Sequence, residues 1–160
     1  MVLVIADYFK RFPEEMRTVG LMVIGYGELE FNLCQCLASA IGDVDVAILT
    51  MFRARGEDSR LNITDALIRR KYAAVGLHDS YNTMLGAYRW CKSVRNQYAH
   101  CMWAEEDNRL IFTDFDKAAQ KSSLQQSTLD LLSVYETLLR KQLRYFFYTH
   151  ELLTYLSHEY

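Results

Sequence analysis

The sequence has a single proline, Pro13, and only seven glycines among its 160 residues. Because proline and glycine most often interrupt helices, their scarcity permits long continuous helices. The sequence also lacks an uncharged stretch of 18 residues, an internal repeat, and a linker rich in proline, glycine or serine. These absences argue against a membrane-spanning helix and a repeat protein, and they predict one domain over residues 1–160.

The amino-terminal segment lacks the basic region and apolar core of a signal peptide, so we expect a cytoplasmic protein without membrane association. In that compartment Cys34, Cys36, Cys91 and Cys101 are expected to be reduced thiols. Cys34 and Cys36 would lie about 200° apart around a helix, and no second close pair completes a zinc site. We therefore expect neither a metal nor another cofactor. The net charge of −2 means that binding to a polyanion requires a local basic patch.

Hydrophobic residues recur at helical spacing, which predicts an all-α protein. The expected helices cover residues 19–41, 44–53, about 60–74, about 79–99, and about 123 almost to the C-terminus. Because about four of these are sizeable, we expect an antiparallel helical bundle. The first helix is expected to stop at Gly42, and its mostly apolar face comprises Leu21, Ile24, Glu28, Phe31, Leu33 and Leu37. The stripe of the last helix comprises Leu132, Tyr135, Leu139, Leu143, Phe146, His150 and Leu153.

A small β-hairpin is expected over residues 101–113, around a polar turn at 105–108. It follows the fourth helix, on which one face is predicted to be core because apolar residues recur there at spacings of three and four: Met84, Ala87, Cys91, Val94 and Tyr98. The opposite stripe is polar and contains no acid, unlike an ordinary solvated face with Glu–Lys pairs. It comprises His78, Asn82, Arg89, Lys92, Asn96 and His100, and is interrupted by Leu85.

Where the fourth helix is expected to end, an arginine, an amide and a histidine fall within six residues, in the segment Arg95-Asn96-Gln97-Tyr98-Ala99-His100. Histidine can carry a proton near neutral pH, and arginine offers permanently charged donors that match phosphate oxygens. This combination can cleave a phosphodiester without a metal. The simpler interpretation is that the histidine caps the last helical carbonyls and the arginine pairs with an acid.

This segment, extended over residues 94–103, resembles the signature of the HEPN superfamily. In that signature an arginine is followed by a polar residue, often Asn, and by a histidine after four to six intervening positions; four intervene here. The resemblance implies an all-helical bundle whose signature ends a late helix, followed by a turn or hairpin and a closing helix. The segment Gly27-Glu28-Leu29-Glu30 resembles the family's early helix, which implies that Glu28 lies near the site.

Many catalytically competent HEPN domains are metal-independent endoribonucleases that act as homodimers, with two copies of the motif at a cleft on the two-fold axis. The resemblance therefore implies an RNA substrate and a homodimer. It also addresses a geometric difficulty, because Arg95 and His100 lie about 140° apart on an unbroken helix. Either the backbone turns at Ala99, or a second subunit completes the site. Apolar residues outside the main stripe of the last helix suggest a second copy as well: Leu131, Leu138, Phe147, Tyr148 and Leu152.

Each candidate residue has an expected role in this chemistry. His100, at a helix C-terminus that favours the imidazolium, is expected to exchange protons with the 2′-hydroxyl or the leaving 5′-oxygen. Arg95 is expected to stabilise the charge on the five-coordinate phosphate, and Asn96 to orient the imidazole or the phosphate. Arg89 and Lys92 are expected to hold flanking phosphates.

Several interpretations stay open at the level of sequence. A nuclease could be a toxin with an antitoxin, a phage-defence effector, or a stand-alone enzyme. Toxins paired with nucleotidyltransferase antitoxins often carry a tyrosine two places after the histidine, where this sequence has Met102. A rival hypothesis is a non-catalytic, repressor-like HEPN bundle that binds a regulatory partner, a nucleotide or nucleic acid. A third is an oligomerisation platform whose polar stripe is a hydrated seam between two subunits.

Overall fold

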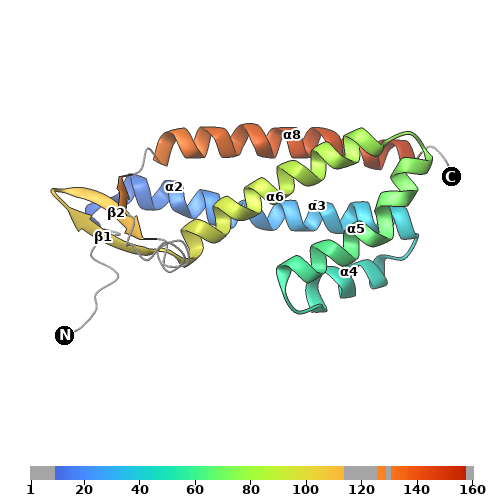
Figure 1. Ribbon diagram of the computed structural model, residues 1–160, viewed down its shortest axis with the longest axis horizontal. Coiled ribbons are helices and arrows are strands. Elements are labelled where there is room, and N and C mark those ends of the chain that lie inside the picture. The colour runs from blue at the N-terminus through green and yellow to red at the C-terminus, as the bar shows by residue number, and fades with distance from the viewer. Residues whose placement is uncertain (1–9, 114–125, 129–130, 158–160) are drawn as a thin grey trace. The chain divides into compact units, whose positions relative to one another are not determined.

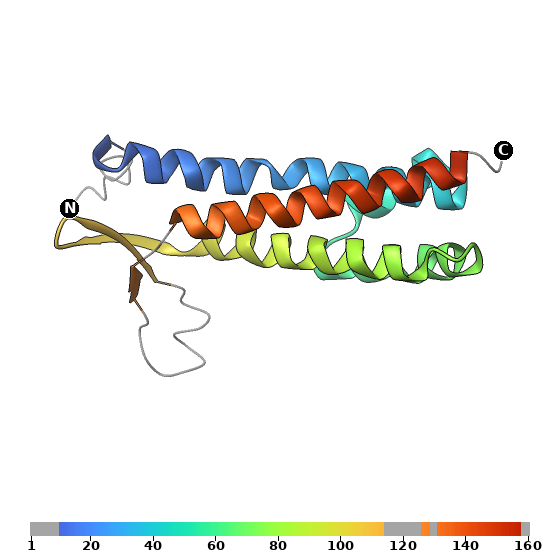
Figure 2. The same cartoon turned by 90° about the horizontal axis from the view of Figure 1, so that it is seen from above.

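The computed structural model describes residues 10–113, 126–128 and 131–157. Helices dominate it, and a small antiparallel sheet follows α6 (Figures 1 and 2). The predicted all-α bundle with a small β insertion is therefore confirmed. Among the described helices, none combines the length and hydrophobicity needed to cross a bilayer. The elements are α2 (Pro13–Ile24), α3 (Tyr26–Ile41), α4 (Val44–Arg53), α5 (Glu57–Ala74), α6 (His78–His100), β1 (Met102–Glu106), β2 (Arg109–Thr113), β3 (Gln126–Thr128) and α8 (Leu131–Ser157).

The chain forms two compact units, each built from two separate segments of sequence. Unit 1 comprises Met1–Tyr26 and Cys91–Leu139, and unit 2 comprises Gly27–Trp90 and Arg140–Tyr160. Helices α6 and α8 therefore pass from one unit into the other. Unit 1 contains α2, the sheet and the end of α6, whereas unit 2 contains α4, α5 and most of α3.

Buried tyrosines connect the helices of unit 2. Tyr145 of α8 is fully buried, and its hydroxyl donates a hydrogen bond to the Leu29 carbonyl oxygen of α3 at 2.7 Å. The centroid of its ring lies 5.9 Å from that of Tyr88 in α6. Tyr72 of α5 donates to the Cys36 carbonyl oxygen of α3 at 3.3 Å. The rings of Tyr145 and Tyr72 fill the core while their hydroxyls keep hydrogen-bond partners, as buried tyrosines require.

Two helix boundaries in unit 2 were predicted correctly. Helix α3 ends at Ile41, and Gly42 follows with φ of +74°, a left-handed conformation that glycine adopts without steric cost. Helix α4 occupies the predicted residues 44–53. Asp43 caps it, because the carboxylate accepts a hydrogen bond from the Val46 N–H at 2.9 Å.

The prediction of one helix over residues 19–41 is wrong. Helix α2 begins at Pro13, whose missing N–H costs nothing in the first turn of a helix. It ends at Ile24, and α3 begins at Tyr26 after a one-residue interruption at Gly25. The structure therefore has two consecutive helices where hydrophobic periodicity alone indicated one.

The predicted apolar face of this region is also only half correct. Leu33 and Leu37 are fully buried, but Leu21, Ile24 and Phe31 are 43%, 79% and 57% exposed. Glu28 is exposed as well. The buried stripe of α3 has spacings of three and four from Tyr26 through Leu29 to Leu33, and this stripe leaves Glu28 and Phe31 off the covered face. The buried face consists of Met22, Tyr26, Leu29, Leu33 and Leu37.

The predicted core face of α6 is confirmed. All five expected residues, Met84, Ala87, Cys91, Val94 and Tyr98, are at most 7% exposed. The opposite stripe is less uniformly solvated than its composition indicates, because Leu85 is 1% and Lys92 is 8% exposed. The exposed or half-buried members of that stripe are His78, Asn82, Arg89, Asn96 and His100.

The predicted β-hairpin is confirmed as the antiparallel pair β1 and β2. Its turn is formed by Asp107 and Asn108, whose φ angles of +49° and +57° match the left-handed conformation that these residue types tolerate. The sheet has a third strand, β3, which pairs with β2. The expected start of the last helix, Ser123, lies outside the described residues. Because Gln126–Thr128 forms a strand, that helix begins later than predicted, at Leu131.

The predicted buried stripe of α8 is wrong. Leu139 and Leu143, which were expected on it, are 39% and 69% exposed, and His150 is exposed. Apolar residues occur on both faces of this helix, so hydrophobicity alone does not distinguish the covered face from the open one. The side chains that α8 buries are Leu138, Tyr145, Thr149 and Leu152.

Gly86 offers a test of the helical backbone of α6. It is exposed, it lies in the helix interior, and a Cβ added there would meet no atom within 4 Å. We therefore expect Gly86→Ala to raise the free energy of unfolding by about 0.5–1 kcal/mol, because alanine loses less backbone entropy on folding. Urea-induced unfolding monitored by circular dichroism would measure the change. A destabilised variant would contradict the helical conformation at this residue.

Candidate functional site

The predicted catalytic residues lie in unit 1, in the last two turns of α6. The helix continues through Ala99 to His100, so the alternative in which the backbone turns at Ala99 is wrong. On this continuous helix Arg95 and His100 are separated by about 140° of rotation and about 7.5 Å of rise. The two side chains therefore leave the helix in different directions.

The Arg95 guanidinium is held in place by two neighbours within unit 1. Its Nη1 donates a hydrogen bond to the Asn96 side-chain oxygen at 2.8 Å, and its Cζ lies 5.5 Å from the centroid of the Tyr26 ring. Tyr26 is 3% exposed, so it forms a fixed surface beneath the cation. The Arg95 Nε is buried and has no hydrogen-bond partner among the described residues. Asn96 thus positions the arginine, a contact that the sequence-based roles did not include.

His100 is the last residue of α6, and it is exposed. An aromatic cluster connects the helix end to the sheet: the Tyr98 centroid lies 6.1 Å from that of Trp103 in β1 and 5.7 Å from that of Phe112 in β2. Between helix and sheet, the half-buried Cys101 thiol donates to the Tyr98 carbonyl oxygen at 3.6 Å. This packing fixes the point at which the chain leaves His100.

The three residues predicted to bind substrate occupy different environments. Arg89 is exposed and belongs to unit 2. Lys92 belongs to unit 1 and is only 8% exposed, so it offers a phosphate much less surface than Arg89 does. Glu28 is exposed in unit 2, where its backbone carbonyl accepts a hydrogen bond from Asn32 at 2.8 Å. Among the predicted site residues, Arg95 and Asn96 are in direct contact.

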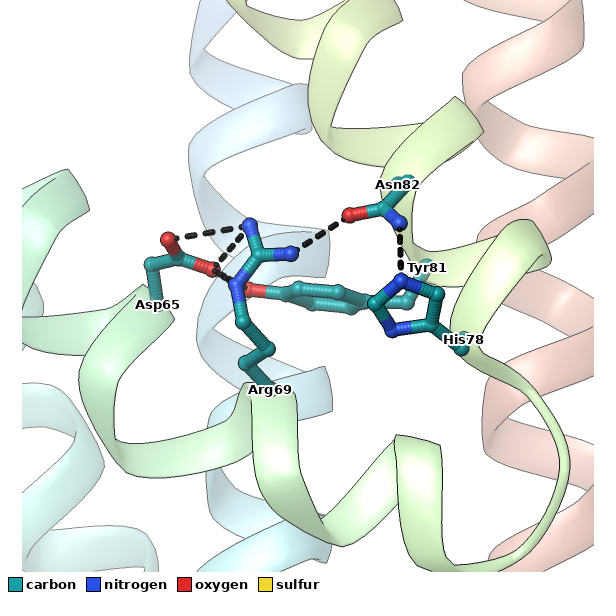
Figure 3. Close-up of polar contacts among 5 residues, drawn as sticks. All are labelled: Asp65, Arg69, His78, Tyr81 and Asn82. Atoms are coloured by element: carbon teal, nitrogen blue, oxygen red, sulfur yellow. Dashed lines mark hydrogen bonds and ion pairs between the residues drawn. The ribbon is translucent and has the colours of Figure 1, made fainter.

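A second polar cluster, which sequence reasoning largely missed, connects α5 to α6 within unit 2 (Figure 3). Arg69 forms a two-pronged pair with the Asp65 carboxylate through Nε at 3.0 Å and Nη2 at 3.1 Å. Its Nη1 donates to the Asn82 side-chain oxygen at 2.6 Å. The Tyr81 hydroxyl donates to Asp65 at 2.8 Å, and the Asn82 nitrogen lies 2.8 Å from Nε2 of His78. All five side chains are connected.

This cluster stabilises the packing of α5 against α6 through hydrogen bonds between the two helices. The carboxylate of Asp65 is shared by Arg69 and Tyr81, and the hydrogen bond that Arg69 donates to Asp65 raises the pKa of Arg69. Burial, assisted by the hydrogen bond to Asp65, raises the pKa of Tyr81. His78 and Asn82 were expected on the polar stripe, whereas Arg69, the partner of Asn82 on α5, was not identified. The available signal was the i,i+4 spacing of Asp65 and Arg69.

Buried thiol and tyrosine hydroxyl groups make the stability of the fold sensitive to high pH. Burial raises the pKa of the Cys36 thiol from 9.0 to about 12 and that of Tyr98 from 10.0 to about 12, and it also raises the pKa of Tyr72. These groups hold their protons more tightly when folded, so their contribution is complete below pH 9 and is lost as pH rises towards 12. We expect the urea midpoint to fall across this range. An unchanged midpoint would contradict the burial of these groups.

The contacts at the end of α6 determine which chemistry the candidate site can perform. Comparison of the chain with models of known families, with curated proteins and with solved structures finds no match. Among the residues that the structure describes, no three His, Cys, Asp or Glu side chains are grouped so that they could hold a metal ion. The groups available at the end of α6 are a positioned guanidinium, an amide and an exposed imidazole.

Proposed function

We propose that this protein is a metal-independent endoribonuclease of the HEPN type, acting on RNA in the cytoplasm as a homodimer. One observation carries the proposal: Asn96 and Tyr26 hold the Arg95 guanidinium near the end of α6, and His100 is exposed at the helix terminus. A fixed cation loses little entropy when a phosphate binds, and an exposed imidazole can exchange protons with a substrate. A toxin restrained by an antitoxin or another regulatory protein, and a phage-defence effector, are the roles that suit such an activity.

The proposed reaction is transesterification at one phosphodiester. A neutral His100 accepts the proton of the 2′-hydroxyl, whose oxygen attacks the adjacent phosphorus. As the bond to the 5′-oxygen breaks, the protonated imidazole of the same His100 returns the proton to that oxygen, so one histidine acts first as base and then as acid. Arg95 stabilises the negative charge on the five-coordinate phosphate. The products are a 2′,3′-cyclic phosphate and a 5′-hydroxyl, and DNA is not cleaved because it lacks the attacking hydroxyl.

The geometry of α6 supports the proposed homodimer. Because Arg95 and His100 leave one helix about 140° apart, a site that uses both groups needs the arginine of one subunit and the histidine of another. Exposed apolar side chains on α2, Ile24 at 79% and Leu21 at 43%, are available for contacts between molecules. The exposed Arg89 is the better placed of the two proposed flanking cations, since Lys92 is buried.

A second candidate function is a non-catalytic HEPN-like protein that binds RNA, a nucleotide or a regulatory partner. The observation in its favour is that Arg95 already has Asn96 and Tyr26 as partners. The two functions are distinguished by incubating the purified protein with labelled RNA in EDTA, beside Arg95→Ala and His100→Ala. Cleavage by the wild type alone, with a 2′,3′-cyclic phosphate product, supports the nuclease. Intact RNA with retained binding supports the rival.

A further inference from the structure

A stretch of α8 in unit 2 concentrates positive charge in a chain that is slightly acidic overall. Between Glu136 and Glu151 the helix carries Arg140, Lys141 and Arg144 and no acidic residue, although the whole chain has 20 acids and 18 lysines and arginines. Arg140 and Arg144 are four residues apart, so they lie one turn above each other on the same face. Both are exposed. This face therefore carries more positive than negative charge, with Glu136 and Glu151 flanking the three cations on the same helix.

Large apolar side chains lie among these cations. Phe147 is 67% and Leu143 is 69% exposed, whereas the opposite side of α8 buries Tyr145 completely. Phe147 also makes an edge-on contact with the half-buried Tyr148, at a centroid separation of 5.2 Å and an interplanar angle of 88°. The exposed face of α8 thus alternates guanidinium groups with an aromatic ring and a leucine.

Helix α6 contributes a third aromatic ring to the same region of unit 2. The Lys141 ammonium lies 5.9 Å from the centroid of the Trp90 ring, and both residues are half-buried. Below this contact, the buried rings of Tyr88 and Tyr145 pack together and hold the two helices side by side. We call the set Trp90, Arg140, Lys141, Arg144, Phe147 and Tyr148 the basic–aromatic face; all six belong to unit 2.

We propose that the basic–aromatic face binds single-stranded nucleic acid. Arginine and lysine pair with backbone phosphates, and exposed aromatic rings stack with bases, a combination that proteins use for single strands without sequence preference. A duplex would present its phosphates but not the faces of its bases. An acidic amphipathic helix is less well matched, since three of the four large apolar groups here are aromatic. The proposal goes beyond RNA cleavage, because this face holds a strand whether or not the strand is cut.

The test uses a fluorescent single-stranded DNA oligonucleotide, because DNA lacks the 2′-hydroxyl and its binding can be measured without cleavage. In Arg140→Gln/Arg144→Gln, loss of two phosphate contacts should weaken binding about tenfold or more near 0.1 M salt. The slope of log affinity against log salt should also become shallower by about 1.4. Phe147→Ala should weaken binding about tenfold through loss of one stacked base. The matched control is Arg53→Gln/Arg55→Gln, which removes two exposed arginines elsewhere in unit 2.

A second measurement depends on tryptophan fluorescence. The chain has two tryptophans, so Trp103→Phe leaves Trp90 as the only one, and the oligonucleotide should quench its emission. Affinities within twofold of wild type for both face variants, or an equal loss in the control, would overturn the proposal. So would altered self-association with unchanged oligonucleotide binding, which would identify the face as a protein interface. RNA cleavage by the wild type together with unchanged DNA binding by the face variants would support the nuclease and refute this inference. Absence of RNA cleavage together with weakened DNA binding by the face variants would refute the nuclease and support this inference.

Discussion

Replacement of His100 with alanine is expected to reduce the rate of RNA cleavage by about 10²–10⁴-fold, the usual contribution of a general acid–base group. The variant should fold normally, because His100 is exposed at the end of α6 and fills no part of the core. Initial rates on a labelled RNA in EDTA would measure the loss. His150→Ala is the matched control, since it removes another exposed histidine, on α8 in unit 2. Equal losses in both variants would contradict a catalytic role.

The same prediction extends to mixtures of inactive subunits. If each site joins Arg95 of one subunit to His100 of the other, then a dimer of one Arg95→Ala and one His100→Ala chain contains one intact site. Equal co-expression makes half of the dimers mixed. Each mixed dimer has one intact site where the wild-type dimer has two, so about a quarter of the wild-type activity should return. Mixed dimers that form but stay inactive would contradict a shared site. This outcome is the sharpest test of the divergent side-chain directions on α6.

Replacement of Tyr145 with alanine is expected to lower the free energy of unfolding by about 3–5 kcal/mol, the range for loss of a large buried aromatic side chain. Tyr145 is fully buried, its ring packs on Tyr88 and Phe146, and its hydroxyl donates to the Leu29 carbonyl oxygen. Tyr145→Phe keeps the ring and loses only the hydrogen bond, so it should cost about 1 kcal/mol. Urea-induced unfolding would measure both changes.

Phe147→Ala is the control for this comparison, because Phe147 lies two residues further along α8 and is 67% exposed. Its removal should change stability by no more than about 0.5 kcal/mol. Similar losses for Tyr145→Ala and Phe147→Ala would mean that the buried face of α8 is misassigned. The pair therefore tests the correction that the structure makes to the sequence-based stripe of this helix.

Sequence alone predicted elements in which local chemistry and hydrophobic pattern agree. Helix α4 lies between the cap Asp43 and the end of a strongly apolar segment, and the core face of α6 has apolar residues at every expected position. The pattern failed where both faces of a helix are apolar, as on α8, and where a one-residue interruption at Gly25 left the periodicity unbroken. In those places burial depends on which elements pack together, and a linear pattern does not contain that information.

The candidate site was also predictable from the sequence only in part. The spacing of Arg95, Asn96 and His100 along α6 could be read directly from the sequence, and so could their position at the end of a helix. The Tyr26 ring beneath Arg95 could not, because it lies 69 positions away in the chain. The contact between Tyr81 and Asp65 was missed for the same reason, since only the packing of α5 against α6 brings the two together. Long-range contacts of this kind need the fold.

The environment of Cys101 has a practical consequence for studying the assembly. Cys34, Cys36 and Cys91 are buried, whereas Cys101 is only half-buried and adjoins His100 in the chain. A nitroxide spin label should therefore react first with Cys101. Pulsed dipolar spectroscopy on the otherwise unaltered protein would then report how far apart two copies of the helix terminus lie in solution, while leaving the guanidinium and the imidazole untouched.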